Sequence, residues 1–123
     1  MARTTVHTDK GPQNFTSQVL TPVAGALAAP NPSNGHVLDV TLAANTTIAK
    51  PVYDSIDAGP FAGEELTFIL RQSGAGSFTA TWAAGYKAVG LALTASTTGV
   101  DVVTFVYDGT TWNASGKFIG GTA

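Results

Sequence analysis

The side chains capable of acid–base or metal chemistry are few in this chain and lie far apart. Its two histidines are His7 and His36, and neither has a second metal-type ligand at the spacing of a turn or a helix. Asp54 and Asp57 lie close together in an irregular segment, where their oxygens could bind Ca²⁺, although aspartates in loops more commonly cap turns. No two of the eight carboxylates stand out as the acid and base of a hydrolase. The sequence therefore predicts a protein that is not an enzyme and holds no metal or cofactor.

Motifs for nucleophilic or phosphate chemistry are also missing. The stretch from Ser73 to Ser77 is rich in glycine, as phosphate-binding loops are, but no Lys-Ser or Lys-Thr pair follows it. It also joins two expected strands, whereas a phosphate loop opens a helix. No serine lies in a G-x-S-x-G elbow. We interpret the stretch as a turn between strands.

Aromatic residues offer the remaining binding chemistry. Most of them alternate with Leu or Val along expected strands, which assigns them to the core. Tyr86 and Trp112 are the two that we expect at the surface, where their rings could contact a sugar.

The elements that would carry these residues are short strands with a period of two. Leu38, Val40 and Leu42 share one face of a strand that starts near His36, and residues 46–49 form a second short strand. A polar turn follows each of them, as expected for strands of a small all-β domain.

Two hairpins are expected after residue 63. The first pairs residues 66–71 with residues 77–82 through a turn that contains Gly74 and Gly76. The second pairs residues 100–107 with residues 111–114 through Asp108-Gly109, a strong hairpin signal. Residues 100–107 are apolar on both faces, which predicts a central strand.

The fold class predicted from these strands is all-β, a compact antiparallel sandwich or jelly roll that covers residues 36–123. Residues 1–35 lack a sustained period and contain four of the six prolines, so we expect an extended N-terminal arm. The arm is either a solvated tail or a segment that docks on a neighbouring subunit, and its apolar side chains favour docking. These side chains are Phe15, Val19, Leu20, Val23 and Leu27.

Composition narrows the classes of partner. The 123 residues suit one domain, and charged residues make up 11%, compared with about 25% in a typical protein. The net charge is −2 and the basic residues are scattered, which argues against a nucleic-acid partner. No apolar run approaches the ~20 residues of a membrane span, so no membrane partner is expected either. The uncharged, hydroxyl-rich surface suits contact with other protein subunits, because hydroxyl groups are cheaper to desolvate than charges.

Residues 63–112 carry a recognisable pattern. It reads G-x-x-L-T-F-I-L-x-Q-x-G-x-G, then a strand that ends in T-W, then V-D-V-x-T-F-V-Y-D-G-T-x-W. The pattern, with a similar piece upstream that extends it to roughly residues 36–115, resembles a segment of structural proteins from tailed bacteriophages. Such segments occur in capsid decoration proteins and in tail-fibre or receptor-binding proteins. The resembled positions are structural, so the resemblance implies no catalytic residue.

The resemblance implies one of two roles. In the first, the chain is a capsid decoration (cement) protein, a homotrimer on the outer capsid surface that stabilises contacts between subunits of the major capsid protein. The apolar residues of the arm would then bind the capsid, and the protein would be made in the cytoplasm of the host bacterium. In the alternative, the chain is a tail-fibre or receptor-binding module that contacts glycans of the bacterial surface. The first role is the main hypothesis from the sequence, because the arm is long enough to reach a neighbouring subunit.

Overall fold

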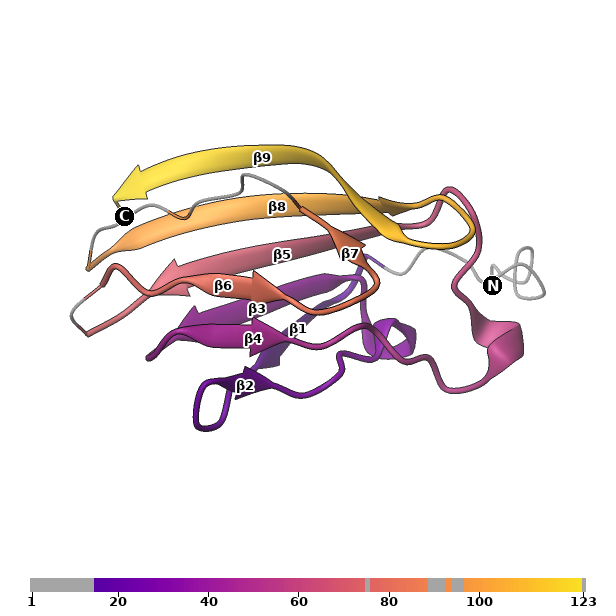
Figure 1. Ribbon diagram of the computed structural model, residues 1–123, viewed down its shortest axis with the longest axis horizontal. Coiled ribbons are helices and arrows are strands. Elements are labelled where there is room, and N and C mark those ends of the chain that lie inside the picture. The colour runs from indigo at the N-terminus through magenta and orange to yellow at the C-terminus, as the bar shows by residue number, and fades with distance from the viewer. Residues whose placement is uncertain (1–14, 75, 89–92, 94–96, 123) are drawn as a thin grey trace, which may run out of the picture.

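The computed structural model of the chain describes residues 15–74, 76–88, 93 and 97–122 and shows a sandwich of two β-sheets (Figure 1). The larger sheet has the strand order β1-β3-β5-β8-β9-β7, and the smaller sheet has the order β2-β4-β6. The all-β sandwich predicted from the sequence is confirmed. No helix in these residues is long and apolar enough to cross a membrane. The strands are β1 (Ser17–Leu20), β2 (Ala26–Leu27), β3 (Val37–Leu42), β4 (Thr46–Ile48), β5 (Glu65–Gln72), β6 (Ala80–Trp82), β7 (Tyr86–Lys87), β8 (Gly99–Tyr107) and β9 (Trp112–Thr122), with short 3-10 helices η2 (Pro32–Asn34) and η3 (Ile56–Ala58).

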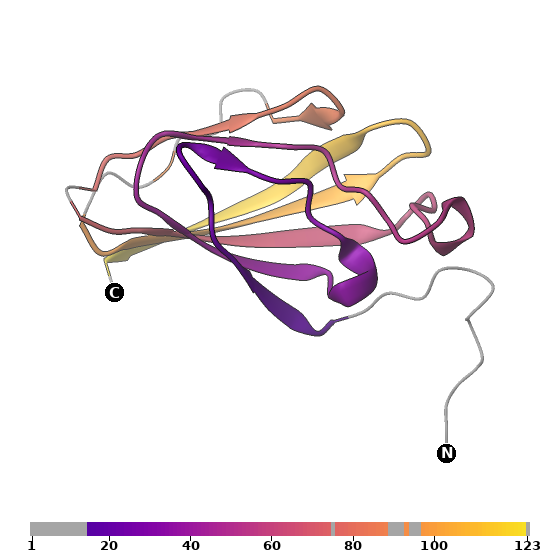
Figure 2. The same cartoon turned by 90° about the horizontal axis from the view of Figure 1, so that it is seen from below.

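The chain winds alternately through the two sheets, which Figure 2 shows as two layers. Strands β1, β3 and β5 pair in parallel in the larger sheet, and β2, β4 and β6 pair in parallel in the smaller sheet. Parallel neighbours need a crossover connection, and here each crossover runs through a strand of the opposite sheet. The result is three stacked coils, β1–β2, β3–β4 and β5–β6. Among the described strand pairs, only β5–β8 and β8–β9 are antiparallel, so the predicted antiparallel sandwich is corrected to a mixed one.

One of the two predicted hairpins is confirmed and the other is wrong. Strands β8 and β9 pair around Asp108-Gly109, and β8 lies between β5 and β9 as predicted for a central strand. Strands β5 and β6, in contrast, belong to different sheets. Gly74 and Gly76 do adopt positive φ, of 60° and 70°, but they help the chain to cross from one sheet to the other. A period of two identifies a strand without identifying the sheet that contains it.

The core lies between the sheets and follows the predicted period. In the larger sheet, Leu38 pairs in register with Phe68 and Val40 pairs with Leu70, and all four side chains are buried. Strands β2 and β4 of the smaller sheet cover this layer from the opposite side. Strand β8, next to β5 in the larger sheet, extends it. Each fully buried side chain of this size contributes roughly 1.5–3 kcal/mol relative to an exposed one. The other buried apolar and aromatic residues of this core are Leu27, Leu42, Ile48, Leu66, Tyr86, Val103, Phe105 and Trp112.

The described part of the predicted arm is built into the sandwich. Strand β1 is the edge of the larger sheet, and β2 is the edge of the smaller one. Leu27 is in the core and Leu20 packs against it. A boundary at residue 35 therefore does not separate an arm from the sandwich in this part of the chain, because residues 17–34 form the first coil and its return. Residues 1–14 of the predicted arm, His7 among them, lie outside the described residues.

Candidate functional site

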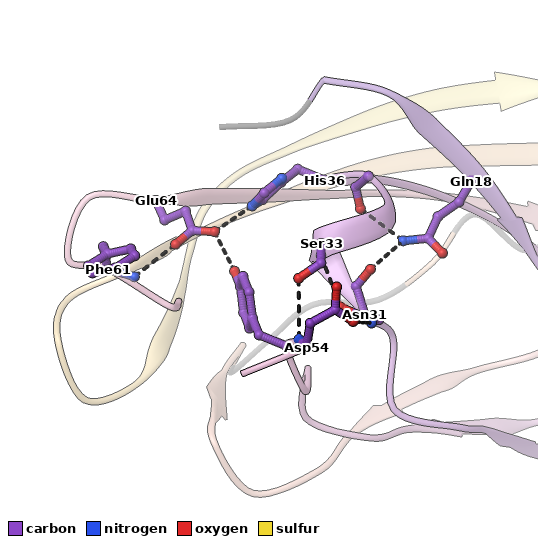
Figure 3. A network of polar contacts seen from close by, with 9 residues as sticks. Gln18, Asn31, Ser33, His36, Asp54, Phe61 and Glu64 are labelled. Carbon is purple, nitrogen blue, oxygen red and sulfur yellow. Dashed lines mark hydrogen bonds and ion pairs between the residues drawn. The ribbon is translucent and has the colours of Figure 1, made fainter. Parts of the chain in front are cut away.

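The buried carboxylate of Glu64 forms hydrogen bonds with several loops at one end of the sandwich. This is the end at which β3 and β5 start, on the right in Figure 1. His36 directly precedes β3 and Glu64 directly precedes β5, and these strands are parallel neighbours, so both residues come to the same end. Glu64 Oε2 contacts the His36 ring nitrogen Nε2 and accepts a hydrogen bond from the Tyr53 hydroxyl, while Oε1 accepts from the Phe61 amide at 2.8 Å (Figure 3). The side chains of His36 and Glu64 are each 3% exposed.

The electrostatics of this cluster favour an ionised Glu64. Burial raises the pKa of the Glu64 carboxyl, but the hydrogen bonds from His36, Tyr53 and the Phe61 amide lower it by more, so the pKa lies below its ordinary value. Burial and then the bond to Glu64 raise the pKa of the Tyr53 hydroxyl, which remains a neutral donor. A carboxylate accepts only, so His36 Nε2 carries the proton in this contact.

The cluster functions as a structural clamp. Both oxygens of Glu64 are bonded to protein donors, which come from the start of β3 and from the loop of residues 53–61. In the part of the chain that the structure describes, no three His, Cys, Asp or Glu residues form a group that could hold a metal ion. The clamp therefore ties residues 53–61 to the start of β3 and β5.

A second set of hydrogen bonds fixes the loop of the first coil beside the clamp. Asn31 Nδ2 donates to Asp54 Oδ1 at 2.7 Å, and Asn31 Oδ1 accepts from the Ser33 amide at 3.0 Å (Figure 3). Gln18 Nε2 donates to the carbonyl oxygens of Asn31 and Gly35, at 2.9 Å each. Asp54 is thus used to hold neighbouring turns together, as aspartates in loops commonly are.

The two aromatics predicted at the surface are buried, and that prediction was wrong. Trp112 is 1% exposed and packs on Tyr107 with ring centroids 5.0 Å apart. Tyr86 is 8% exposed and donates from its hydroxyl to the Ala49 carbonyl at 2.8 Å, and burial raises the pKa of that hydroxyl. Tyr86 on β7 pairs in register with Trp112 on β9, so both rings belong to the two strands at one edge of the larger sheet.

A different aromatic residue lines a hollow beside this edge. Trp82 at the end of β6 is half-buried, although the sequence placed it in the core. It lines a hollow of about 320 Å³ together with Tyr86, Lys87 and Ala88. A larger hollow of about 540 Å³ lies at the turns of residues 22–25 and 43–46, and its lining has neither an aromatic nor a charged side chain. Of these two hollows, only the one beside Trp82 is lined by aromatic rings and a charged side chain.

The residues expected to dock as an arm divide into two sets. Leu20 and Leu27 turn into the sandwich and serve the core. The other three are exposed on the first coil, with exposed fractions of 74% for Phe15, 78% for Val19 and 74% for Val23. These three residues therefore stay available for contact with another protein surface, as the sequence predicted for all five.

Comparison with known families identifies the domain. A family model described as "Putative phage tail fibre C-terminal domain" matches residues 27–112, which is more than half of the chain. The chain belongs to this family. Comparison with curated proteins found no match, and comparison with solved structures found none either. The match to the tail-fibre family runs from β2 to the first residue of β9, and it makes the chain a phage structural protein associated with the virion. The phage origin implied by residues 63–112 is thus confirmed, whereas capsid decoration is not the role that this family describes.

Sequence reasoning missed the two features that organise the site. Glu64 lies 28 residues from His36 and 11 from Tyr53, so no local spacing connects the three. The only sequence signal for the contact was that a histidine and an acidic residue each lie close to the start of an expected strand. The hollow beside Trp82 was missed because a strand pattern does not show where its sheet ends.

Proposed function

We propose that the chain is a receptor-contacting module of a phage tail fibre and that it binds saccharides of the bacterial surface. The match of the sandwich to a tail fibre C-terminal domain carries this proposal. The hollow lined by Trp82 and Lys87 supports it, because small-ligand sites combine apolar and aromatic walls with a few polar groups.

The capsid hypothesis has lost part of its basis. It relied on a free arm with five apolar contacts, and Leu20 and Leu27 are turned into the sandwich. Exposed Phe15, Val19 and Val23 fit attachment to a neighbouring virion subunit, which a fibre needs as much as a coat protein does. Assembly as a homotrimer remains a prediction for either role.

Adsorption competition tests the proposal. The purified chain is added to host cells before the phage that encodes it, and free phage is counted over time. We expect the chain to bind cells saturably and to slow adsorption, and we expect both effects to disappear on cells stripped of surface polysaccharide. Heat-unfolded chain is the control. A folded chain that neither binds cells nor delays the phage contradicts the proposal.

A further inference from the structure

We propose that the hollow beside Trp82 is a subsite for an acidic saccharide, with the indole as its stacking platform and the ammonium groups of Lys87 and Lys50 as its charge partners. This inference rests on the proposed function and names the class of ligand that the domain would take. It follows from three features: a fixed aromatic ring, one lysine in the lining with a second lysine packed over the nearby Gly85, and no carboxylate among the described lining residues.

The indole of Trp82 is held in one orientation. Its centroid lies 5.0 Å from that of Phe68, 5.2 Å from Tyr86 and 4.8 Å from Phe105, with interplanar angles of 61° to 74°. These edge-to-face contacts support the ring from the core side, while the residue remains half-buried. An aromatic face is negative, so it attracts the weakly positive C–H groups on one face of a pyranose ring. A ring already fixed loses little conformational entropy when a sugar stacks on it.

One lysine lines the hollow, and a second packs against the residue that precedes β7. Lys87 lines the hollow and is exposed. Lys50 follows the end of β4, and its side chain passes over Gly85, which directly precedes β7. A Cβ at Gly85 would lie 2.6 Å from Lys50 Cδ, so only glycine permits this approach, and its φ of 106° also favours glycine.

The charges of Lys87 and Lys50 have no ion-pair partner among the described residues. Across the described residues, neither lysine forms an ion pair, whereas Arg71 on the larger sheet is paired with Asp39 at 2.8 Å. The described residues that line the hollow include no carboxylate. A saccharide that bears a carboxylate or a phosphate would supply the missing anion, and a neutral saccharide would not. The volume of about 320 Å³ is at the lower end for ligand sites, which suits one or two sugar rings.

The expected affinity is modest for one domain. An exposed ion pair typically changes binding by a few-fold, so loss of both lysine charges should weaken binding by about tenfold. Weak single sites suit a fibre, since several copies that bind one surface multiply their affinities.

The test uses the full chain and three probes. These are a trisaccharide that contains hexuronic acid, its carboxyl-reduced neutral counterpart and a phosphorylated trisaccharide, each titrated by calorimetry. We expect the neutral sugar to bind at least about tenfold more weakly than an acidic one, and acidic-sugar binding to weaken with added salt. The preferred acidic probe distinguishes a carboxylate ligand from a phosphate ligand.

Matched variants locate the site. The double variant Lys50→Gln/Lys87→Gln should lose about tenfold in affinity for the acidic sugar, and Lys50→Arg/Lys87→Arg should retain it. Acrylamide quenching gives a readout that a general loss of stability does not imitate. Trp112 is buried, so the quenchable fluorescence arises from Trp82, and bound sugar should shield it.

The outcomes separate this inference from the proposed function. Binding that ignores the lysine charges, equal affinity for the neutral sugar, or no binding of any probe overturns the acidic subsite. If the lysine double variant still binds host cells as the parent does, the subsite is wrong and the tail-fibre function stands. If the acidic sugar binds as expected but the chain fails to bind host cells, the subsite stands and the proposed function fails.

Discussion

Replacement of Glu64 by Gln tests the clamp at the end of the sandwich. The carboxylate accepts hydrogen bonds from Tyr53, His36 and the Phe61 amide. A glutamine can retain one of them through its carbonyl oxygen, for example the bond from Phe61. Its NH₂ group then faces the His36 N–H, a second donor, in a buried position. Two charge-assisted bonds are lost, and a buried donor loses its acceptor.

The structure sets the size of the effect. Hydrogen bonds to charged groups contribute about 1.5–3 kcal/mol each, and the amide can recover part of one through the Tyr53 hydroxyl. We therefore expect Glu64→Gln to lower the free energy of unfolding by about 2–4 kcal/mol, out of the roughly 5–15 kcal/mol of a typical domain. The corresponding fall in Tm is about 10 °C for a chain of this size.

Urea unfolding followed by circular dichroism measures the change. The matched control is Glu65→Gln, the same substitution at an exposed neighbour, which should change the free energy of unfolding by less than about 0.5 kcal/mol. Tyr53→Phe completes a double-mutant cycle. Since Tyr53 and Glu64 are in contact, their effects should be non-additive by about 0.5–3 kcal/mol.

The pH dependence is the more specific signature. Because the folded-state pKa of Glu64 lies below the ordinary value of 4.5, its stabilising contribution is full above about pH 4.5 and is lost as the pH falls through the folded-state pKa. Glutamine does not titrate, so the stability difference between parent and variant should shrink as the pH is lowered from 5 toward 3. A difference independent of pH, or a variant as stable as Glu65→Gln, refutes the clamp.

Three further predictions concern groups outside the clamp. Trp112→Ala should lower the free energy of unfolding by about 3–5 kcal/mol in a urea titration, because the side chain is buried, and a loss below about 1 kcal/mol would contradict its place in the core. Burial raises the pKa of Tyr86, and burial with the bond to Glu64 raises that of Tyr53, so stability should be full below about pH 10 and should fall as the pH rises further. Tyr86→Phe should reduce this alkaline slope, and an unchanged slope counts against the assignment. The Asp108 carboxyl, which accepts from the Thr111 and Thr110 amides and then from Asn113, should titrate by NMR with a pKa of about 2, and an ordinary value near 4 would rule out this turn geometry.

The sequence predicted the elements with clear local signals. The alternation of Leu38, Val40 and Leu42 identified β3 and its buried face, because period two is a local property of a strand. Asp108-Gly109 identified the turn between β8 and β9, because that dipeptide suits the positive φ of Gly109.

The sequence did not predict the winding of the chain between two sheets. Parallel partners lie 20 residues apart for β1 and β3 but 30 apart for β3 and β5, so no repeat of fixed length appears. The same patterns of alternation are compatible with hairpins or with coils, and only the packing of distant strands decides between them. The first coil was interpreted as an arm because prolines interrupt its period, although its two short strands still pair at the sheet edges.

The candidate site was predicted least well. Tyr86 and Trp112 were expected at the surface because they do not alternate with Leu or Val as the other aromatics do, but both side chains are buried at the sandwich edge. Trp82 alternates with apolar residues as core side chains do, yet its sheet ends beside it. Exposure of an aromatic depends on which strand lies next to it, and that information is absent from local sequence.

The position of the chain on the virion tests the central claim most directly. Antibody raised against the purified chain and coupled to gold is imaged on intact phage by electron microscopy. We expect gold at the tail fibres, in a copy number that matches the fibres, and no gold on the capsids. Gold distributed over the capsid shell with the spacing of the capsid lattice, together with unlabelled fibres, would contradict the tail-fibre role and restore the capsid decoration hypothesis.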